Sequence, residues 1–142
     1  MTSARQDIVI PGEEHIYHCF SRCVRRAFLC GFDRLTKKNY DHRKDWIDAR
    51  LRFLVTVFRI DVLTPAVMDN HLHVMIRTRA ADDHPFSDEE VAKRWLRLYP
   101  KRRKKDRTPA EPTKNEINYI LSNKKRLSEL RLRLDSVSWF MK

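Results

Sequence analysis

Alternation of polar and apolar residues predicts a β-strand in the middle of the chain, where the sequence reads MDNHLHVMIRT. Successive side chains on a strand point to opposite faces, so Leu72, Val74 and Ile76 form one apolar face. His71 and His73 then share the other face, side by side. The pattern predicts a strand that buries one face against helices and presents two imidazoles on the other.

A second strand is predicted over residues 15–23, which are rich in aromatic and β-forming residues (HIYHCFSRC). The same alternation places one group of side chains on one face: Ile16, His18, Phe20 and Arg22. If this strand lies beside the histidine strand, Arg22 is in a position to meet a phosphate; the alternative is a solvated edge charge. His18 is interpreted as an ordinary polar residue of that face.

Between these strands, residues 41–58 repeat apolar side chains at three- and four-residue steps, which predicts an amphipathic helix. Residues 59–67 follow as a strand, and Pro65 within it indicates a sheet edge or a bulge because proline donates no ladder hydrogen bond. Asp69-Asn70 is typical of the turn that leads into the histidine strand. The fold class expected is α+β, an antiparallel sheet packed with helices.

The second half of the chain reads as helical. Ser87 with Glu90, and Thr113 with Glu116, have the spacing of capping boxes. Apolar residues at helical spacing follow each of them. We expect residues 1–80 to form the α+β core domain and residues 81–142 a helical basic extension or insertion.

The net charge of the chain limits the kinds of molecule that it is expected to bind. The chain has 142 residues, and 30 Lys+Arg against 19 Asp+Glu give a net charge of +11. A chain with this much positive charge is expected to bind a polyanion, and nucleic acid is favoured over a membrane surface. The alternative is a basic protein that has no such partner. The candidate phosphate-binding residues are Arg22, Arg25, Arg26, Lys101, Arg102, Arg103, Lys104 and Lys105.

Other features exclude whole classes of protein. Only two glycines occur, which excludes a Walker loop or a dinucleotide-binding fingerprint. No apolar run is long enough for a transmembrane helix, and the N-terminus lacks the apolar core of a signal peptide. The three cysteines fit no paired zinc spacing and are expected to be reduced thiols of a cytoplasmic protein.

Together, Tyr17-His18, Ser21-Arg22, the helix and the stretch from Met68 to Val74 resemble a known family. It is the single-tyrosine transposases of small bacterial insertion sequences, and above all their relatives associated with repetitive extragenic palindromes. These enzymes belong to the nucleases named for a His-hydrophobe-His motif, of which His71-Leu72-His73 is this sequence's version. The resemblance covers residues 14–78 and implies a ferredoxin- or RRM-like core.

The resemblance implies that His71 and His73 bind Mg²⁺ or Mn²⁺, with a third ligand supplied by a helix. The metal would act on one phosphate of single-stranded or hairpin DNA, and a tyrosine would form a 5′-phosphotyrosine bond. A bacterial cytoplasmic homodimer is the expected state. Tyr119 is the candidate nucleophile and Asn123, one turn later, the candidate third ligand. The family's tyrosine helix closes with an Asn-Pro pair absent here, so we also expect a truncated chain without its true nucleophile.

Three hypotheses stay open from the sequence. The chain is a transposase-type nuclease domain, or it is a nucleic-acid-binding module that kept the fold and lost the chemistry. The third alternative is an unrelated basic α+β protein, which predicts neither metal nor DNA affinity.

Overall fold

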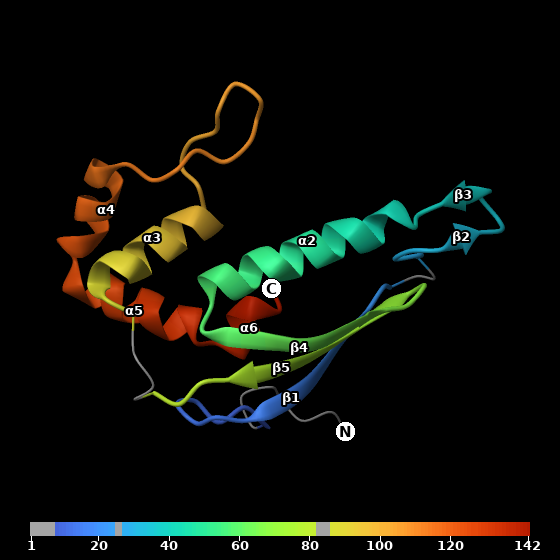
Figure 1. The fold of residues 1–142 in the computed structure, drawn as a ribbon, viewed down its shortest axis with the longest axis horizontal. Helices are drawn as coiled ribbons and strands as arrows, with labels where there is room; N and C mark the ends of the chain where they lie inside the picture. The colour runs from blue at the N-terminus through green and yellow to red at the C-terminus, as the bar shows by residue number, and fades with distance from the viewer. Residues whose placement is uncertain (1–7, 25–26, 82–85) are drawn as a thin grey trace.

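The computed structural model describes residues 8–24, 27–81 and 86–142 and shows an α+β fold, as predicted (Figure 1). The predicted strands and the first helix are present within a few residues of their expected bounds, and a helix follows each of the two predicted capping boxes. In chain order the strands and helices are β1 (Ile16–Arg22), β2 (Phe32–Asp33), β3 (Lys38–Asn39), α2 (His42–Val57), β4 (Ile60–Val67), β5 (His71–Thr78), α3 (Asp88–Leu98), α4 (Lys114–Leu121), α5 (Lys124–Leu134) and α6 (Val137–Phe140).

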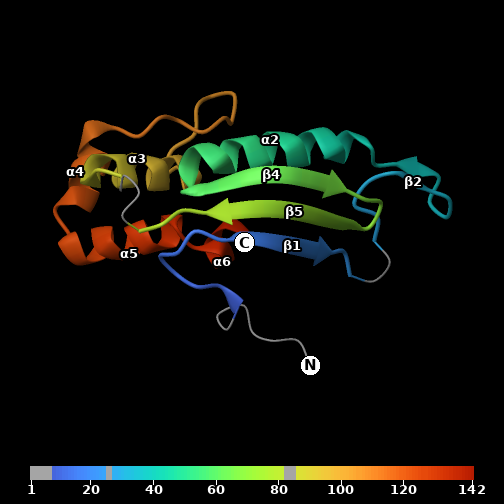
Figure 2. The same ribbon diagram turned by 60° about the horizontal axis from the view of Figure 1, so that its bottom comes forward.

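The main sheet has three antiparallel strands in the order β1-β5-β4, so the histidine strand lies in the centre (Figure 2). β4 pairs on one side only among the described strands, and its register with β5 shifts between Val62 and Thr64. Pro65 therefore lies on an edge strand next to a bulge. The sequence-based prediction of an edge or a bulge at this proline is confirmed.

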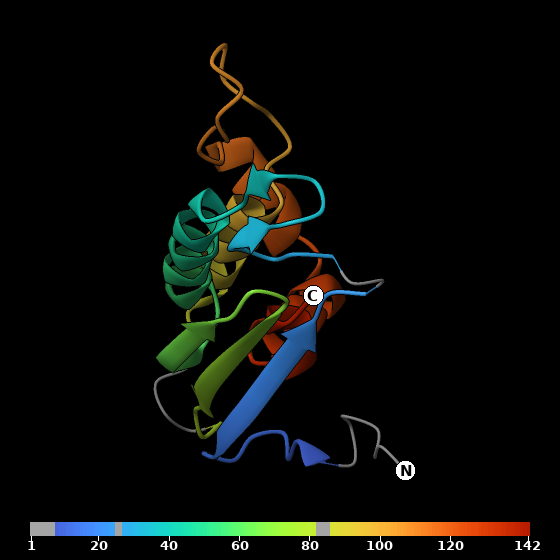
Figure 3. The same ribbon diagram turned by 90° about the vertical axis from the view of Figure 1, so that its right-hand side faces the viewer.

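Helices cover one face of this sheet (Figure 3). Val74 and Ile76 of β5 are fully buried against them, and Leu51 and Leu54 of α2 contribute to the same core. The predicted separation of the two faces of β5 is thus confirmed. The opposite face, which carries His71, is not covered by any described helix, and we call it the histidine face.

The helices after residue 86 pack on that same core rather than forming a separate one. Their starts follow from local capping. Ser87 accepts a hydrogen bond from the Glu90 backbone N–H, and Thr113 and Glu116 form a complete capping box. The segments expected to divide near residue 80 therefore share one hydrophobic core.

One hairpin was not predicted from the sequence, and two predicted site residues fall outside the described part of the chain. The stretch between β1 and α2, for which the sequence predicted no strand, contains the short β2–β3 hairpin, whose turn includes Lys37 at φ 58°. Arg25 and Arg26, two candidate phosphate-binding residues, lie outside the described residues. No helix in the described part of the chain is both long and apolar enough to cross a membrane.

Candidate functional site on the histidine face

His71 and His73 lie on the same uncovered face of the central strand, as the alternation predicted. Arg22 pairs directly across from His71, and Phe20 pairs directly across from His73. Directly paired residues on neighbouring strands share a face, so β1 presents an arginine and an aromatic ring beside the two imidazoles. Phe20 is 67% exposed, which makes its ring accessible to a partner molecule.

A third imidazole joins the pair. His18 Nε2 lies 2.8 Å from His73 Nδ1, and the two rings are stacked with centroids 5.0 Å apart. The His71 and His73 rings meet edge to face at 4.8 Å. His18 was interpreted from the sequence as an ordinary polar residue, and the structure instead places it in direct contact with a candidate metal ligand.

The hydrogen bonds of the site favour one tautomer for each candidate ligand. His71 Nδ1 lies 2.7 Å from Asn70 Oδ1. An amide oxygen can only accept, so His71 carries its proton on Nδ1 and leaves Nε2 as a free lone pair. If His18 Nε2 likewise accepts from His73 Nδ1, then His73 also has a free lone pair on Nε2.

Electrostatics keeps His73 in the neutral form that a metal ligand needs. Burial lowers its pKa below the ordinary 6.5, and the neighbouring His71 and His18 lower it further. A lowered pKa makes protonation less competitive at neutral pH. The lowered pKa of His73 therefore favours its neutral form, in which one ring nitrogen has a lone pair.

The donor set of the histidine face consists of the two imidazoles of His71 and His73. Within the described residues there is no group of three His, Cys, Asp or Glu side chains arranged to hold a metal. Mg²⁺ usually keeps several waters and binds through one or two carboxylates together with substrate phosphates, because oxygen ligands suit Mg²⁺ and Mn²⁺ best. The two imidazoles supply no such oxygen, so a hard ion held by them would need its oxygen ligands from water and a phosphate, with Asn70 and His18 as outer hydrogen-bond partners of the imidazoles.

Backbone groups of the loop after β1 hold the turn before β5 in place. The backbone N–H groups of Leu29 and Cys30 both donate to the Asp69 carbonyl, at 2.6 and 3.1 Å, and that of Cys23 donates to the Asn70 carbonyl at 2.8 Å. Gly31 packs so closely that an added Cβ would lie 2.7 Å from Asp69 Oδ1. The loop after β1 thus fixes the residue that orients His71.

The other cations near the start of β4 are neutralised. Arg77 and Arg79 both contact Asp61, at 2.8 and 2.7 Å. Burial raises the pKa of the Asp61 carboxyl, but the hydrogen bonds from Arg77 and Arg79 outweigh burial and lower the pKa below 3.8. Arg22, by contrast, forms no ion pair within the described residues, which leaves its charge available to a phosphate.

Tyr119 is not brought to the histidine pair. It belongs to α4, which packs against α3 and α5 at the opposite end of the molecule from the β4–β5 hairpin (Figures 1 and 2). Its ring is 72% exposed and lies 4.9 Å from Lys101 Nζ. Asn123 caps α5 by accepting from the Arg126 backbone N–H at 2.9 Å, so its side chain serves the helix.

The basic run Lys101–Lys105 forms an exposed loop between α3 and α4 that projects from the body of the molecule (Figure 1). Its residues are not equivalent. Arg102 contacts Glu116 at 3.3 Å, and hydrogen bonds from Thr113 and Arg102 lower the pKa of Glu116 to about 2. Arg102 therefore helps to fix the loop, while Lys104 and Lys105 extend into solvent without an ion-pair partner in the described residues.

Comparison of the chain with family models, with curated proteins and with solved structures finds no match.

Proposed function

We propose that this chain binds single-stranded or hairpin DNA across the histidine face, with Mg²⁺ or Mn²⁺ held by His71 and His73. It is the DNA-binding and metal-binding part of a transposase-type nuclease of the His-hydrophobe-His class. The observation that carries the proposal is the grouping of two correctly oriented imidazoles, a free arginine and an exposed aromatic ring on one uncovered sheet face.

Each residue of this face has a distinct task in the proposal. Arg22 neutralises a backbone phosphate beside His71. Phe20 offers a flat, exposed ring on which an unpaired base stacks. Asn70 and His18 hold the Nδ1 protons of the two ligands, so that both Nε2 atoms stay available. A bound divalent ion would polarise a non-bridging oxygen of that phosphate.

Cleavage in this class requires a tyrosine hydroxyl. The tyrosine oxygen bonds to phosphorus, the bond from phosphorus to the 3′ oxygen breaks, and that oxygen leaves as a free 3′-OH. Because α4 lies far from the histidine face, Tyr119 is poorly placed for this role within one copy of the chain. In a homodimer, a second copy is the other possible source of the hydroxyl.

The position of Tyr119 favours a second candidate function, a DNA-binding module without cleavage activity. Such a module keeps Arg22, Phe20 and the basic loop as contacts and makes no covalent bond. The two functions differ most directly in the formation of a covalent protein–DNA adduct.

The test is incubation of the protein with Mn²⁺ and end-labelled single-stranded hairpin DNA, followed by denaturing electrophoresis. A transposase-type nuclease gives a nicked strand and a shifted adduct, both lost in His71→Ala and His73→Ala. Retention of the adduct in Tyr119→Phe assigns the nucleophile elsewhere, and its loss assigns it to Tyr119. DNA binding without nicking or adduct selects the module, and no DNA binding at all refutes both functions.

A further inference from the structure

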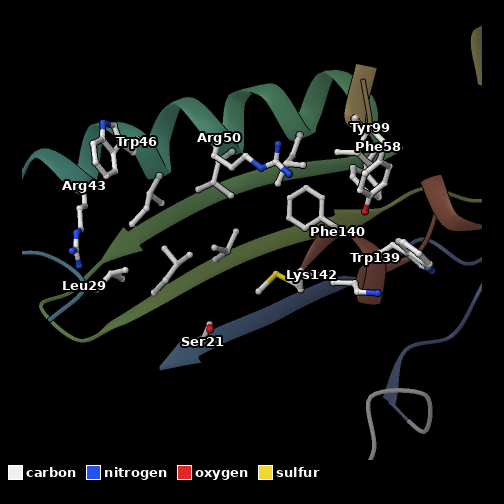
Figure 4. Close-up of a pocket in the computed structure, with 17 residues that line it drawn as sticks. Ser21, Leu29, Arg43, Trp46, Arg50, Phe58, Tyr99, Trp139, Phe140 and Lys142 are labelled. Carbon is white, nitrogen blue, oxygen red and sulfur yellow. The ribbon is translucent and has the colours of Figure 1, made fainter. Parts of the chain in front are cut away.

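An apolar cleft of about 590 Å³ lies on the helix-covered side of the sheet, away from the histidine face (Figure 4). α2 forms its roof, β5 and β1 form its floor, and the chain around α6 closes one end. Leu51 and Leu54 line it from α2, and Leu72 and Val74 line it from β5. At the opposite end the cleft reaches Leu29.

The size of the cleft follows from how one helix covers a three-stranded sheet. Neighbouring strands are about 4.8 Å apart, and a helix with its side chains is about 10 Å wide. One helix therefore covers about two strands, and α2 lies over the β4 side (Figure 3). The inner side of β1 towards Ser21 has no helix above it in the described part of the chain, which leaves space for a second helix beside α2.

Two arginines stand on the edge of the cleft, seven residues apart on α2. Arg43 and Arg50 both line it, and Trp46 lies between them with 66% of its surface exposed. Seven residues correspond to two helical turns, so the Cα atoms of the two arginines are about 10 Å apart along the axis. The cleft thus has an apolar floor, and two arginines two turns apart on α2 stand on its border.

Ion pairing distinguishes these two arginines from other cations of α2. Lys44 pairs with Asp41 at 2.9 Å, and Arg52 pairs with Asp48 at 2.7 Å. Neither Arg43 nor Arg50 forms an ion pair with a described residue; Arg43 donates to the Phe28 carbonyl at 2.9 Å. Of these four cations of α2, the two that border the cleft are those left without a carboxylate.

We propose that the cleft binds an amphipathic α-helix of a partner protein, with leucine-type residues on one face and two acidic residues seven positions apart beside them. The apolar stripe packs on Leu51, Leu72 and Val74, and the carboxylates meet Arg43 and Arg50. A second copy of this chain is the less suitable occupant, because each copy carries +11 and like charges repel. This inference is independent of metal or DNA binding at the histidine face.

Two helical peptides of about 15 residues test it, each with leucines at i, i+3, i+4 and i+7. One carries glutamates seven residues apart beside the leucine stripe, and the other carries lysines at the same positions. Fluorescence anisotropy of the labelled peptides measures their affinity for the full chain. We expect the glutamate peptide to bind at least tenfold more tightly than the lysine peptide.

Arg50→Glu is the decisive variant, because Arg50 is exposed and its replacement does not disturb the core. It should weaken the glutamate peptide about tenfold and strengthen the lysine peptide. Arg52→Glu is the matched control: it makes the same charge change two residues away, at a position that does not line the cleft. The control should leave the preference for the glutamate peptide intact.

Four results overturn the inference. Equal binding of both peptides would show that charge complementarity does not contribute. Binding of neither peptide would show that the cleft is not a docking site for such a helix. Equal weakening by Arg50→Glu and Arg52→Glu reduces the effect to net charge. Sedimentation that shows a dimer dissociated by Arg50→Glu would assign the cleft to a second copy of the chain instead.

Discussion

His18 is predicted to control metal binding without being a metal ligand. Its Nε2 lies 2.8 Å from His73 Nδ1, so a neutral His18 that accepts this proton keeps the lone pair of His73 on Nε2. Without an acceptor at that position, His73 can move its proton to Nε2 and lose the lone pair through which Nε2 would bind the ion. The proposed function therefore depends on a residue of the neighbouring strand.

The expected loss of metal affinity can be taken from what an outer hydrogen-bond partner of a ligand typically contributes. Loss of such a partner typically costs 10- to 100-fold in metal affinity, which corresponds to about 1.4–2.8 kcal/mol. We expect His18→Leu to weaken Mn²⁺ binding by a factor in this range. His18→Gln should retain much of the affinity, because the amide oxygen of glutamine can accept the same proton.

Isothermal titration with Mn²⁺ measures these affinities directly, and thermal unfolding without metal confirms that each variant is folded. His42→Gln is the matched control, since it removes an imidazole at the start of α2, away from the histidine face. Wild-type affinity in His18→Leu would show that His73 needs no acceptor on β1 to bind the ion. If His18→Gln lost as much affinity as His73→Ala, His18 would be a ligand itself.

Three further predictions concern the surroundings of the site. Gly31→Ala should destabilise the fold by about 1–2 kcal/mol, because Gly31 has φ +80° and an added Cβ meets Asp69 Oδ1 at 2.7 Å; denaturant unfolding measures it, and an unchanged midpoint contradicts it. Asp61→Asn should cost about 1–2 kcal/mol at neutral pH. The pKa of the Asp61 carboxyl is lowered in the folded state, so the difference in unfolding free energy between Asp61→Asn and the parent chain should shrink as the pH falls below 3.8 through the folded pKa. A difference that persists in acid argues against stabilisation by the ionised carboxylate. Replacing Lys104 and Lys105 by serine should weaken binding of single-stranded DNA and reduce the salt slope by about 0.7 for each lost phosphate contact; an unchanged slope excludes the loop from the interface.

The sequence predicted the histidine face well because the side-chain period of a strand is fixed by geometry. Once His71 and His73 alternate with Leu72 and Val74, only one face can be buried. The same logic placed Arg22 on a shared face of β1. These statements depend on local pattern alone, and the structure confirms the strand faces.

The features that the sequence did not predict depend on how segments far apart in the chain pair and pack. His18 meets His73 because β1 and β5 pair in a particular register, and no spacing within one strand encodes that register. The cleft beside α2 is likewise a consequence of packing three strands under one helix. The strands β2 and β3 have two residues each, too few for any periodicity to show.

In the proposed function, the histidine face binds DNA through a divalent ion held by His71 and His73. The most direct measurement is anisotropy of a labelled single-stranded hairpin DNA, titrated with the protein in Mn²⁺ and again in EDTA. We predict tighter binding in Mn²⁺ for the parent chain, and no difference between Mn²⁺ and EDTA for the His71→Ala, His73→Ala double variant. Equal binding in Mn²⁺ and EDTA by the parent chain would contradict metal-dependent DNA binding at the histidine face.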